Sequence, residues 1–138
     1  MKYLLDTNIL SETVRPQPHK NVQKWLTEAP TESLYISVLT LGEIRRGVEK
    51  TPASKKRSFL LLWLENELPA WFGENVLPID LEVAERWGYL TAHLPPQHTL
   101  NAIETLLAAT ALTHNCIMVT RNTKDFDVPG LETLNPFA

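Results

Sequence analysis

Acidic and amide residues stand close after the apolar runs of this sequence. Asp6 follows the run KYLL, Glu43 comes soon after SLYISV, and Asn122 and Asp125 lie in the segment TRNTKDF after CIMV. If these runs are parallel strands, the residues that follow them meet at one edge of the sheet. Close carboxylates repel one another unless a cation is bound. Oxygen ligands of this kind favour Mg²⁺ or Mn²⁺.

A further carboxylate, Glu104, lies in the segment LNAIETLLAATAL, residues 100–112. A helix with apolar residues on all sides is expected to be buried, and buried charges need a partner or a metal. The positions three and four residues away are Leu100, Asn101, Leu107 and Ala108, which include no cation. A salt bridge within the helix is therefore excluded, and Glu104 could deliver an oxygen ligand to the same end of the sheet as Asp6.

Oxygen-bound Mg²⁺ suits the hydrolysis of phosphodiester bonds. In two-metal sites one ion activates water and the other stabilises the leaving oxygen, at a separation of about 3.5–4 Å. The histidines are scattered without the spacing of a zinc site, and they are expected at the surface or at helix caps. No Gly-rich phosphate loop is present, which argues against a nucleoside triphosphatase.

Each acidic residue also has a structural interpretation. Asp6 could cap a turn or a helix, Glu43 could pair with Thr40 in a capping box, and Asp125 could cap a turn in NTKDF. These alternatives stay open for the single residues.

The elements that must position these side chains alternate along the chain. Helices are expected between the strands, with the first capped by Asn8 or Ser11, the third opened by Thr40, and the next over residues 54–68. We expect strands at residues 2–5, 33–38, 76–79, 116–119 and 132–134. This alternation predicts one α/β domain over residues 1–138, with a mostly parallel sheet and helices on both faces.

Composition narrows the class of protein further. Hydrophobic residues make up 43% of the chain and charged residues 21%, as in ordinary globular domains, and no run is long enough to span a membrane. Cys116 is the single cysteine, so it is expected as a buried apolar residue in a protein of the reducing cytoplasm. The net charge of -3 gives no overall basic field.

Two local features of the sequence each allow two interpretations. Basic residues gather between Arg45 and Arg57, where they could form a solvated helical surface or a patch that attracts phosphate. Trp63, Trp71 and Phe72 exceed one core-facing stripe, so they could fill the core or cover a surface for a dimer or partner protein.

The chain resembles PIN-domain proteins, and among them the ribonuclease toxins of bacterial toxin–antitoxin pairs (VapC-like and FitB-like). The resemblance rests on the order of YLLDTNILSE with RPQP, ISVLTLGEIRRGVE, ETLLAATAL, VTRNTKDF and LNPF. It implies a three-layer α/β/α sandwich and a Mg²⁺- or Mn²⁺-dependent endoribonuclease that cleaves RNA with metal-activated water. It also implies a homodimer, a small antitoxin protein that wraps the toxin and blocks its site, and a higher assembly of the two.

The resemblance also assigns site residues. Asp6 and Glu43 match the first two acidic positions of the family, Glu104 stands where the family usually has Asp, and Asn122 stands where a fourth acid often lies. The residues matched in supporting roles are Thr7, Asn8, Thr120 and Asp125, and the candidate phosphate contacts are Arg45, Arg46 and Arg121.

The two departures from the pattern have consequences. Glu104 is one methylene longer than Asp, and Asn122 removes a negative charge, so we expect one well-held Mg²⁺ and a second, weaker one. Two other functions remain open: a PIN-like module that binds RNA or antitoxin without cleavage, and a metal phosphohydrolase acting on DNA or small phosphoesters.

Overall fold

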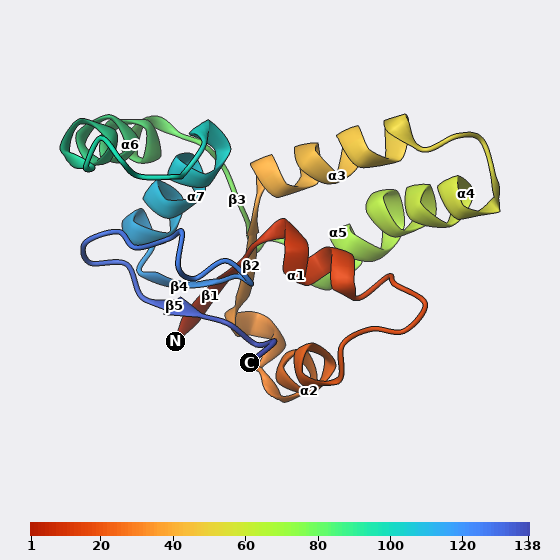
Figure 1. Cartoon of the computed structure of the whole chain (residues 1–138). Helices are drawn as coiled ribbons and strands as arrows, with labels where there is room; N and C mark the ends of the chain where they lie inside the picture. The colour runs from red at the N-terminus through yellow and green to blue at the C-terminus, as the bar shows by residue number, and fades with distance from the viewer.

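The computed structural model covers residues 1–138 and has a five-stranded sheet at its centre, in the order β3-β2-β1-β4-β5 (Figure 1). All neighbouring strands pair in parallel. The strand order reverses at β1, the position where α/β sheets bind ligands beyond the carboxyl ends of their strands. The strands are short: β1 Lys2–Leu5, β2 Leu34–Ser37, β3 Val76–Leu77, β4 Cys116–Val119 and β5 Thr133–Leu134.

Helices cover both faces of the sheet, which confirms the three-layer α/β/α architecture (Figure 1). One face carries α6 (Leu81–His93) and α7 (Ala102–Thr113), which pack closely on each other. The other face carries α1 (Thr7–Glu12), α2 (Lys20–Glu28), α3 (Val38–Lys50), α4 (Lys55–Leu62) and α5 (Leu68–Phe72). A short 3-10 turn, η1 (Thr31–Ser33), precedes β2, and a π-helical segment, η2 (Trp63–Glu67), joins α4 to α5.

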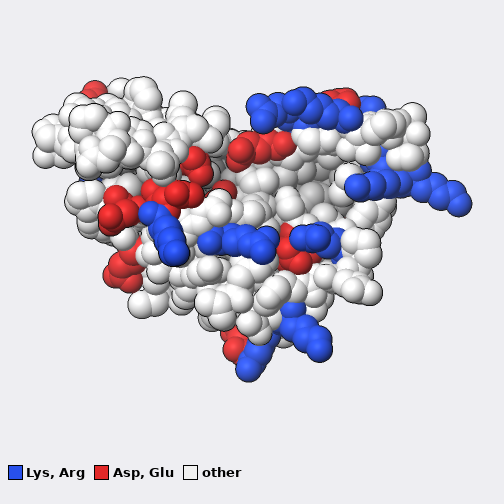
Figure 2. Space-filling model, in the orientation of Figure 1, with Lys and Arg blue, Asp and Glu red and all other residues white.

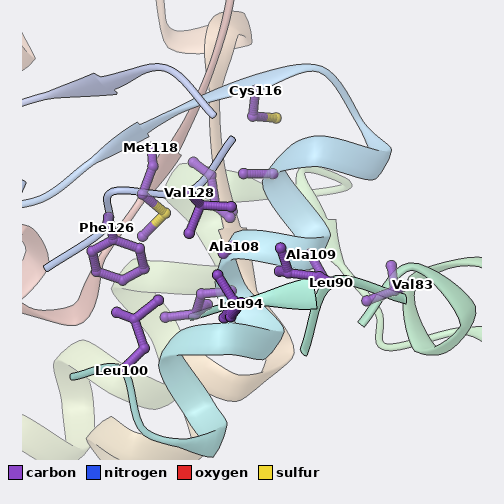
Figure 3. Packing of buried hydrophobic residues seen from close by; sticks show 13 residues of the cluster. Val83, Leu90, Leu94, Leu100, Ala108, Ala109, Cys116, Met118, Phe126 and Val128 are labelled. Atoms are coloured by element: carbon purple, nitrogen blue, oxygen red, sulfur yellow. The ribbon is translucent and has the colours of Figure 1, made fainter. Parts of the chain in front are cut away.

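Two hydrophobic clusters fill the two sides of the sheet. Successive residues of a strand point to opposite faces, so Leu4 and Met118 join the α6–α7 cluster while Leu5 and Val119 join the other. Figure 3 shows the α6–α7 cluster, in which Phe126 and Val128 from the loop after β4 also take part. The strands are thereby fixed from both faces, and their carboxyl ends are held in one place.

The start of two helices differs from the sequence prediction. Helix α1 begins at Thr7, and the Asp6 carboxylate accepts the Thr7 N–H at 2.7 Å. Neither Asn8 nor Ser11 caps this helix, and the alternative that Asp6 caps a helix is confirmed. Helix α3 begins at Val38, where the Ser37 hydroxyl accepts the N–H of Leu39.

The expected capping box between Thr40 and Glu43 is therefore wrong. Thr40 lies inside α3 and is fully buried, and its hydroxyl has no hydrogen-bond partner. Helix α6 is capped by Asp80, whose side chain accepts the Val83 N–H at 3.0 Å.

The aromatic residues that exceeded one core-facing stripe lie mainly in the core. Trp63 and Phe72 are buried and Trp71 is half-buried, whereas Phe59 and Leu62 on α4 are the exposed apolar residues of this region. Cys116 is also buried, and burial raises the pKa of its thiol to about 11. None of the helices has the length and apolar character needed to cross a lipid bilayer.

Candidate functional site

A cavity of about 420 Å³ opens at the carboxyl end of the central strands. Its walls come from the end of β1, from α1, α3 and α7, and from the loop after β4. Acidic side chains gather in the hollow between the α6–α7 side and α3, with basic side chains around it (Figure 2). The lining residues are Asp6, Thr7, Asn8, Ser11, Glu43, Asn101, Ile103, Glu104, Leu107 and Asn122.

Asp6 is the most enclosed acid of this cavity, with 8% of its surface exposed. The N–H of Thr7 donates to its Oδ1 at 2.7 Å, and the Thr120 hydroxyl and the Asn8 side chain donate to its Oδ2 at 2.8 and 3.3 Å. Thr120 Oγ1 in turn accepts the Asn122 N–H at 3.1 Å. These bonds tie the ends of the adjacent strands β1 and β4 together around one carboxylate.

Glu43 reaches the cavity from α3, where it is half-buried. The Thr7 hydroxyl donates to its Oε1 at 2.7 Å. Thr7 thus contacts the first carboxylate through its backbone and the second through its side chain, and it fixes their relative positions.

Glu104 lies nearer the start of its helix than the sequence suggested. Helix α7 begins at Ala102 with Asn101 as N-cap, so Glu104 is in the first turn and only half-buried. The Asn101 side chain accepts the Glu104 N–H at 2.8 Å, and Glu104 Oε1 accepts the Asn101 N–H at 3.0 Å. This is a reciprocal capping box. The prediction that Glu104 is a buried charge is wrong, because the first turn of α7 extends beyond the hydrophobic core.

The remaining predicted residues divide into two groups. Asn122 and Asn8 line the cavity, and Thr120 contacts Asp6 directly. Asp125 lies outside the cavity, where its Oδ1 accepts the Thr99 hydroxyl at 3.1 Å and joins two loops.

The predicted arginines also lie outside the cavity. Arg45 pairs with Glu65 at 3.0 Å and with Glu49 at 3.6 Å on the outer surface of α3. The guanidinium of Arg121 lies 4.6 Å from the centre of the Phe137 ring. The Arg46 side chain is exposed.

Electrostatics within the cavity favour a cation. Burial raises the pKa of the Asp6 carboxyl above 3.8, although the hydrogen bonds from Thr120 and Thr7 lower it. The nearby charges of Glu43 and Glu104 raise it further. The carboxylates are thus close enough to repel one another, and a hard cation would relieve this repulsion.

The donor set fits Mg²⁺ or Mn²⁺, since it consists of oxygen atoms alone. The carboxylates do not yet form a closed cage: no three of the His, Cys, Asp and Glu side chains stand at metal-binding distance from one another. Each carboxylate already accepts hydrogen bonds from the protein. Oε2 of Glu43 and Oε2 of Glu104 have no protein donor, so these atoms are available to a metal.

Two polar residues of the cavity were not predicted as site residues from the sequence. Asn101 caps α7, and Ser11 lines the cavity from α1. The pattern N-A-I-E at 101–104 is a capping box that could have been recognised. No local pattern pointed to Ser11.

Comparison with known proteins identifies the family of this chain. The family model described as PIN domain matches residues 3–130. This chain belongs to the PIN domain family. The relative "VapC ribonuclease Y4jK" of Sinorhizobium fredii is 35% identical over 136 residues, which cover 97% of this chain and 96% of the relative.

Solved structures of PIN domains show the same arrangement. The crystal structure of FitAcB from Neisseria gonorrhoeae has a chain that is 33% identical, with a TM-score of 0.91 and coverage of 98% of both chains. A toxin–antitoxin complex from Klebsiella pneumoniae has a chain with 27% identity, a TM-score of 0.67 and coverage of 98% of both chains. These similarities show that the chain shares its fold with both solved chains.

Proposed function

We propose that this PIN domain is a metal-dependent endoribonuclease that acts as the toxin of a toxin–antitoxin pair. The main support is the convergence of Asp6, Glu43 and Glu104 from three separate segments on one cavity. Relatives of this chain are named ribonuclease, and a similar chain has been solved in a toxin–antitoxin complex. The proposed partners are RNA as substrate and a small antitoxin as inhibitor.

The residues proposed to hold Mg²⁺ or Mn²⁺ are Asp6, Glu43, Glu104 and Asn122, the last through its amide oxygen. When bound, the metal would lower the pKa of water and stabilise charge on the phosphodiester. The protein supplies orientation: Thr120 and Asn8 hold Asp6, and Thr7 holds Glu43. Such preorganisation lowers the cost of stabilising charge in the transition state.

We also propose that the protein forms a homodimer through α6. Leu81 and Tyr89 expose 76% and 68% of their surfaces, and they lie around a shallow hollow at Gly88. Contiguous exposed apolar surface can mark an interface between proteins. Sedimentation of the wild type and of Leu81→Glu measures this: a wild type that stays monomeric would contradict the dimer.

Cleavage of total RNA tests the nuclease assignment. The wild type should cut RNA with Mg²⁺ or Mn²⁺ and stop when a chelator is added, and sequencing of the products maps the sites. Asp6→Asn should lose this activity, whereas Asp127→Asn, an exposed residue outside the cavity, should retain it. A wild type that binds RNA or antitoxin but never cleaves, even with Mn²⁺, would instead identify a binding module.

A further inference from the structure

The segment that follows β5, residues 135–137, lies against the turn that carries Asn122. β5 is an edge strand of two residues, and the carbonyl of Leu134 at its end accepts the Thr120 N–H at 3.0 Å. Parallel strands end at one edge of a sheet, so Asn135 emerges at the same edge as the acidic cavity. The segment does not line the cavity itself. Any effect on the site therefore passes through the turn after β4.

Arg121 is the residue of this turn that the segment contacts. The Asn135 side chain donates from Nδ2 to the Arg121 carbonyl at 3.4 Å. The Arg121 guanidinium lies over the ring of Phe137, 4.6 Å from its centre, which is a cation–π geometry. From α1, Asn8 Oδ1 accepts the Arg121 N–H at 3.3 Å. The segment thus holds both the backbone and the side chain of the residue next to Asn122.

The segment is in turn anchored on the start of α2, toward which the chain runs after β5 (Figure 1). Asn135 Oδ1 accepts the Phe137 N–H at 2.9 Å, and Pro136 between them is buried. The rings of His19 and Phe137 pack edge to face, with centres 5.2 Å apart. The Asn21 side chain donates to the Phe137 carbonyl at 3.3 Å. Residues 135–137 therefore form a bridge from α2 to the turn after β4.

The side chain of Asn122 depends on this bridge. It is exposed and makes no hydrogen bond within the protein, so its direction follows from the backbone of the turn. The Asn122 N–H donates to Thr120 Oγ1 at 3.1 Å, and the Asn122 carbonyl accepts the Asp125 N–H at 3.0 Å. These bonds fix the turn internally. The contacts to Arg121 fix it relative to the sheet and the helices.

We propose that Asn135 and Phe137 are positioning residues, which hold the turn so that Asn122 presents its amide oxygen to the cavity. The proposal rests on the proposed function, because it takes Asn122 as a metal ligand. Residues that orient a ligand raise metal affinity without contacting the metal. They do so because the ligand is ordered before the metal binds, and less freedom is lost on binding.

Solvent exchange of backbone amides, measured by NMR in chelator, tests the hold on the turn directly. Phe137→Leu keeps an apolar side chain but removes the aromatic face, and Asn135→Ala removes the side-chain amide. In each variant the N–H groups of Arg121 and Asn122 should exchange about two- to fivefold faster, because one contact to the turn is lost. The amides within β1 and β4 should keep their wild-type rates.

Titration of the free protein with Mn²⁺ tests the consequence for the site, with the electron paramagnetic resonance signal of the free ion as readout. Phe137→Leu and Asn135→Ala should each raise the Kd of the weaker Mn²⁺, which Asn122 is proposed to bind, by about two- to fivefold. The tighter Mn²⁺ should keep its Kd, because the hydrogen bonds to Asp6 and Glu43 are unchanged.

Two control variants separate positioning from general stability. Phe137→Tyr keeps the aromatic face and should retain the wild-type exchange rates and Kd values. Asn75→Ala is matched to Asn135→Ala, because the Asn75 side chain also joins distant backbone. It donates to the carbonyls of Glu32 and Leu34 at 3.2 and 3.0 Å, beside the start of β2 and outside the cavity. Asn75→Ala should lower the free energy of unfolding but leave both Mn²⁺ affinities unchanged.

The outcomes separate this proposal from the nuclease assignment. Unchanged exchange of the Arg121 and Asn122 amides in both variants overturns the positioning role, even if the wild type cleaves RNA. Faster exchange with unchanged Mn²⁺ affinity also overturns it, as does an equal loss of Mn²⁺ affinity in Asn75→Ala. A protein whose Mn²⁺ affinity falls in Phe137→Leu, but which never cleaves RNA, would keep the positioning role and overturn the nuclease.

Discussion

Asp6 and Glu104 line the same cavity, but the chain holds them in opposite ways. Asp6 stands at the end of a central strand, is nearly enclosed, and has a raised pKa because of burial and neighbouring acids. Glu104 stands in the first turn of α7, half-exposed, with one oxygen in a capping box. Ionised Asp6 therefore destabilises the fold, whereas Glu104 stabilises it. An acidic site can thus combine one residue whose ionisation destabilises the fold with another residue that stabilises the fold.

The largest expected difference concerns RNA cleavage. Asp6→Asn should lower the rate about 100-fold or more, since it removes the enclosed charge around which the site is organised. Glu104→Gln should cost about tenfold, because the other acids remain and the longer side chain is less rigidly held. Initial rates on one mapped RNA site measure both. An equal or larger loss from Glu104→Gln would contradict this order.

The two metal positions proposed for the cavity should also differ in their affinity for Mg²⁺. One Mg²⁺ should bind at least about tenfold more tightly than a second, because Asn122 carries no charge. Asn122→Asp should strengthen the second ion in particular. Calorimetric titration of the free protein gives both affinities, and two tight, equivalent sites in the wild type would contradict the prediction.

The free energy of unfolding should distinguish the capping role of Glu104 from the effect of its charge. In chelator, Glu104→Ala should lose about 1 kcal/mol of unfolding free energy, because the capping box is broken. Glu104→Gln should lose much less, since Gln can still accept the Asn101 N–H. Urea unfolding measures both variants. Equal losses would show that the charge, and not the cap, provides the stability.

The smallest effect is a pH dependence due to Asp6. Its folded pKa lies above its unfolded value, so the folded state binds more protons between the two. The contribution of Asp6 to unfolding free energy is therefore complete below pH 3.8 and is lost as pH rises through the raised pKa. In chelator, the difference in stability between the wild type and Asp6→Asn should shift toward the variant as pH rises. A difference independent of pH would contradict the raised pKa.

The sequence was sufficient for the order of strands and helices, the parallel sheet, and the gathering of Asp6, Glu43, Glu104 and Asn122 at one cavity. These depend on apolar runs and on the geometry of parallel sheets, which are visible locally. The roles of these residues as metal ligands stay predictions.

Helix starts were harder to predict, because several residues near each start can accept an N–H. Thr40 and Glu43 have the spacing of a capping box, but the Ser37 hydroxyl caps α3 instead. The true box at Asn101 and Glu104 was missed because Glu104 was interpreted as a buried residue inside an apolar helix that included Leu100. The division of cations into paired and free ones also depends on packing between distant segments, as Arg45 and Glu65 show.

The hydrogen bond between Thr120 and Asp6 joins residues 114 positions apart. The central strand β1 is made first during synthesis and Thr7 and Asn8 follow it directly, but the hydrogen bond from Thr120 to Asp6 cannot form until the residues after β4 emerge near the end of the chain. Contacts of such long range form late in folding. A nascent chain that stops before β4 therefore lacks the assembled site, so translation of most of this protein would produce no nuclease.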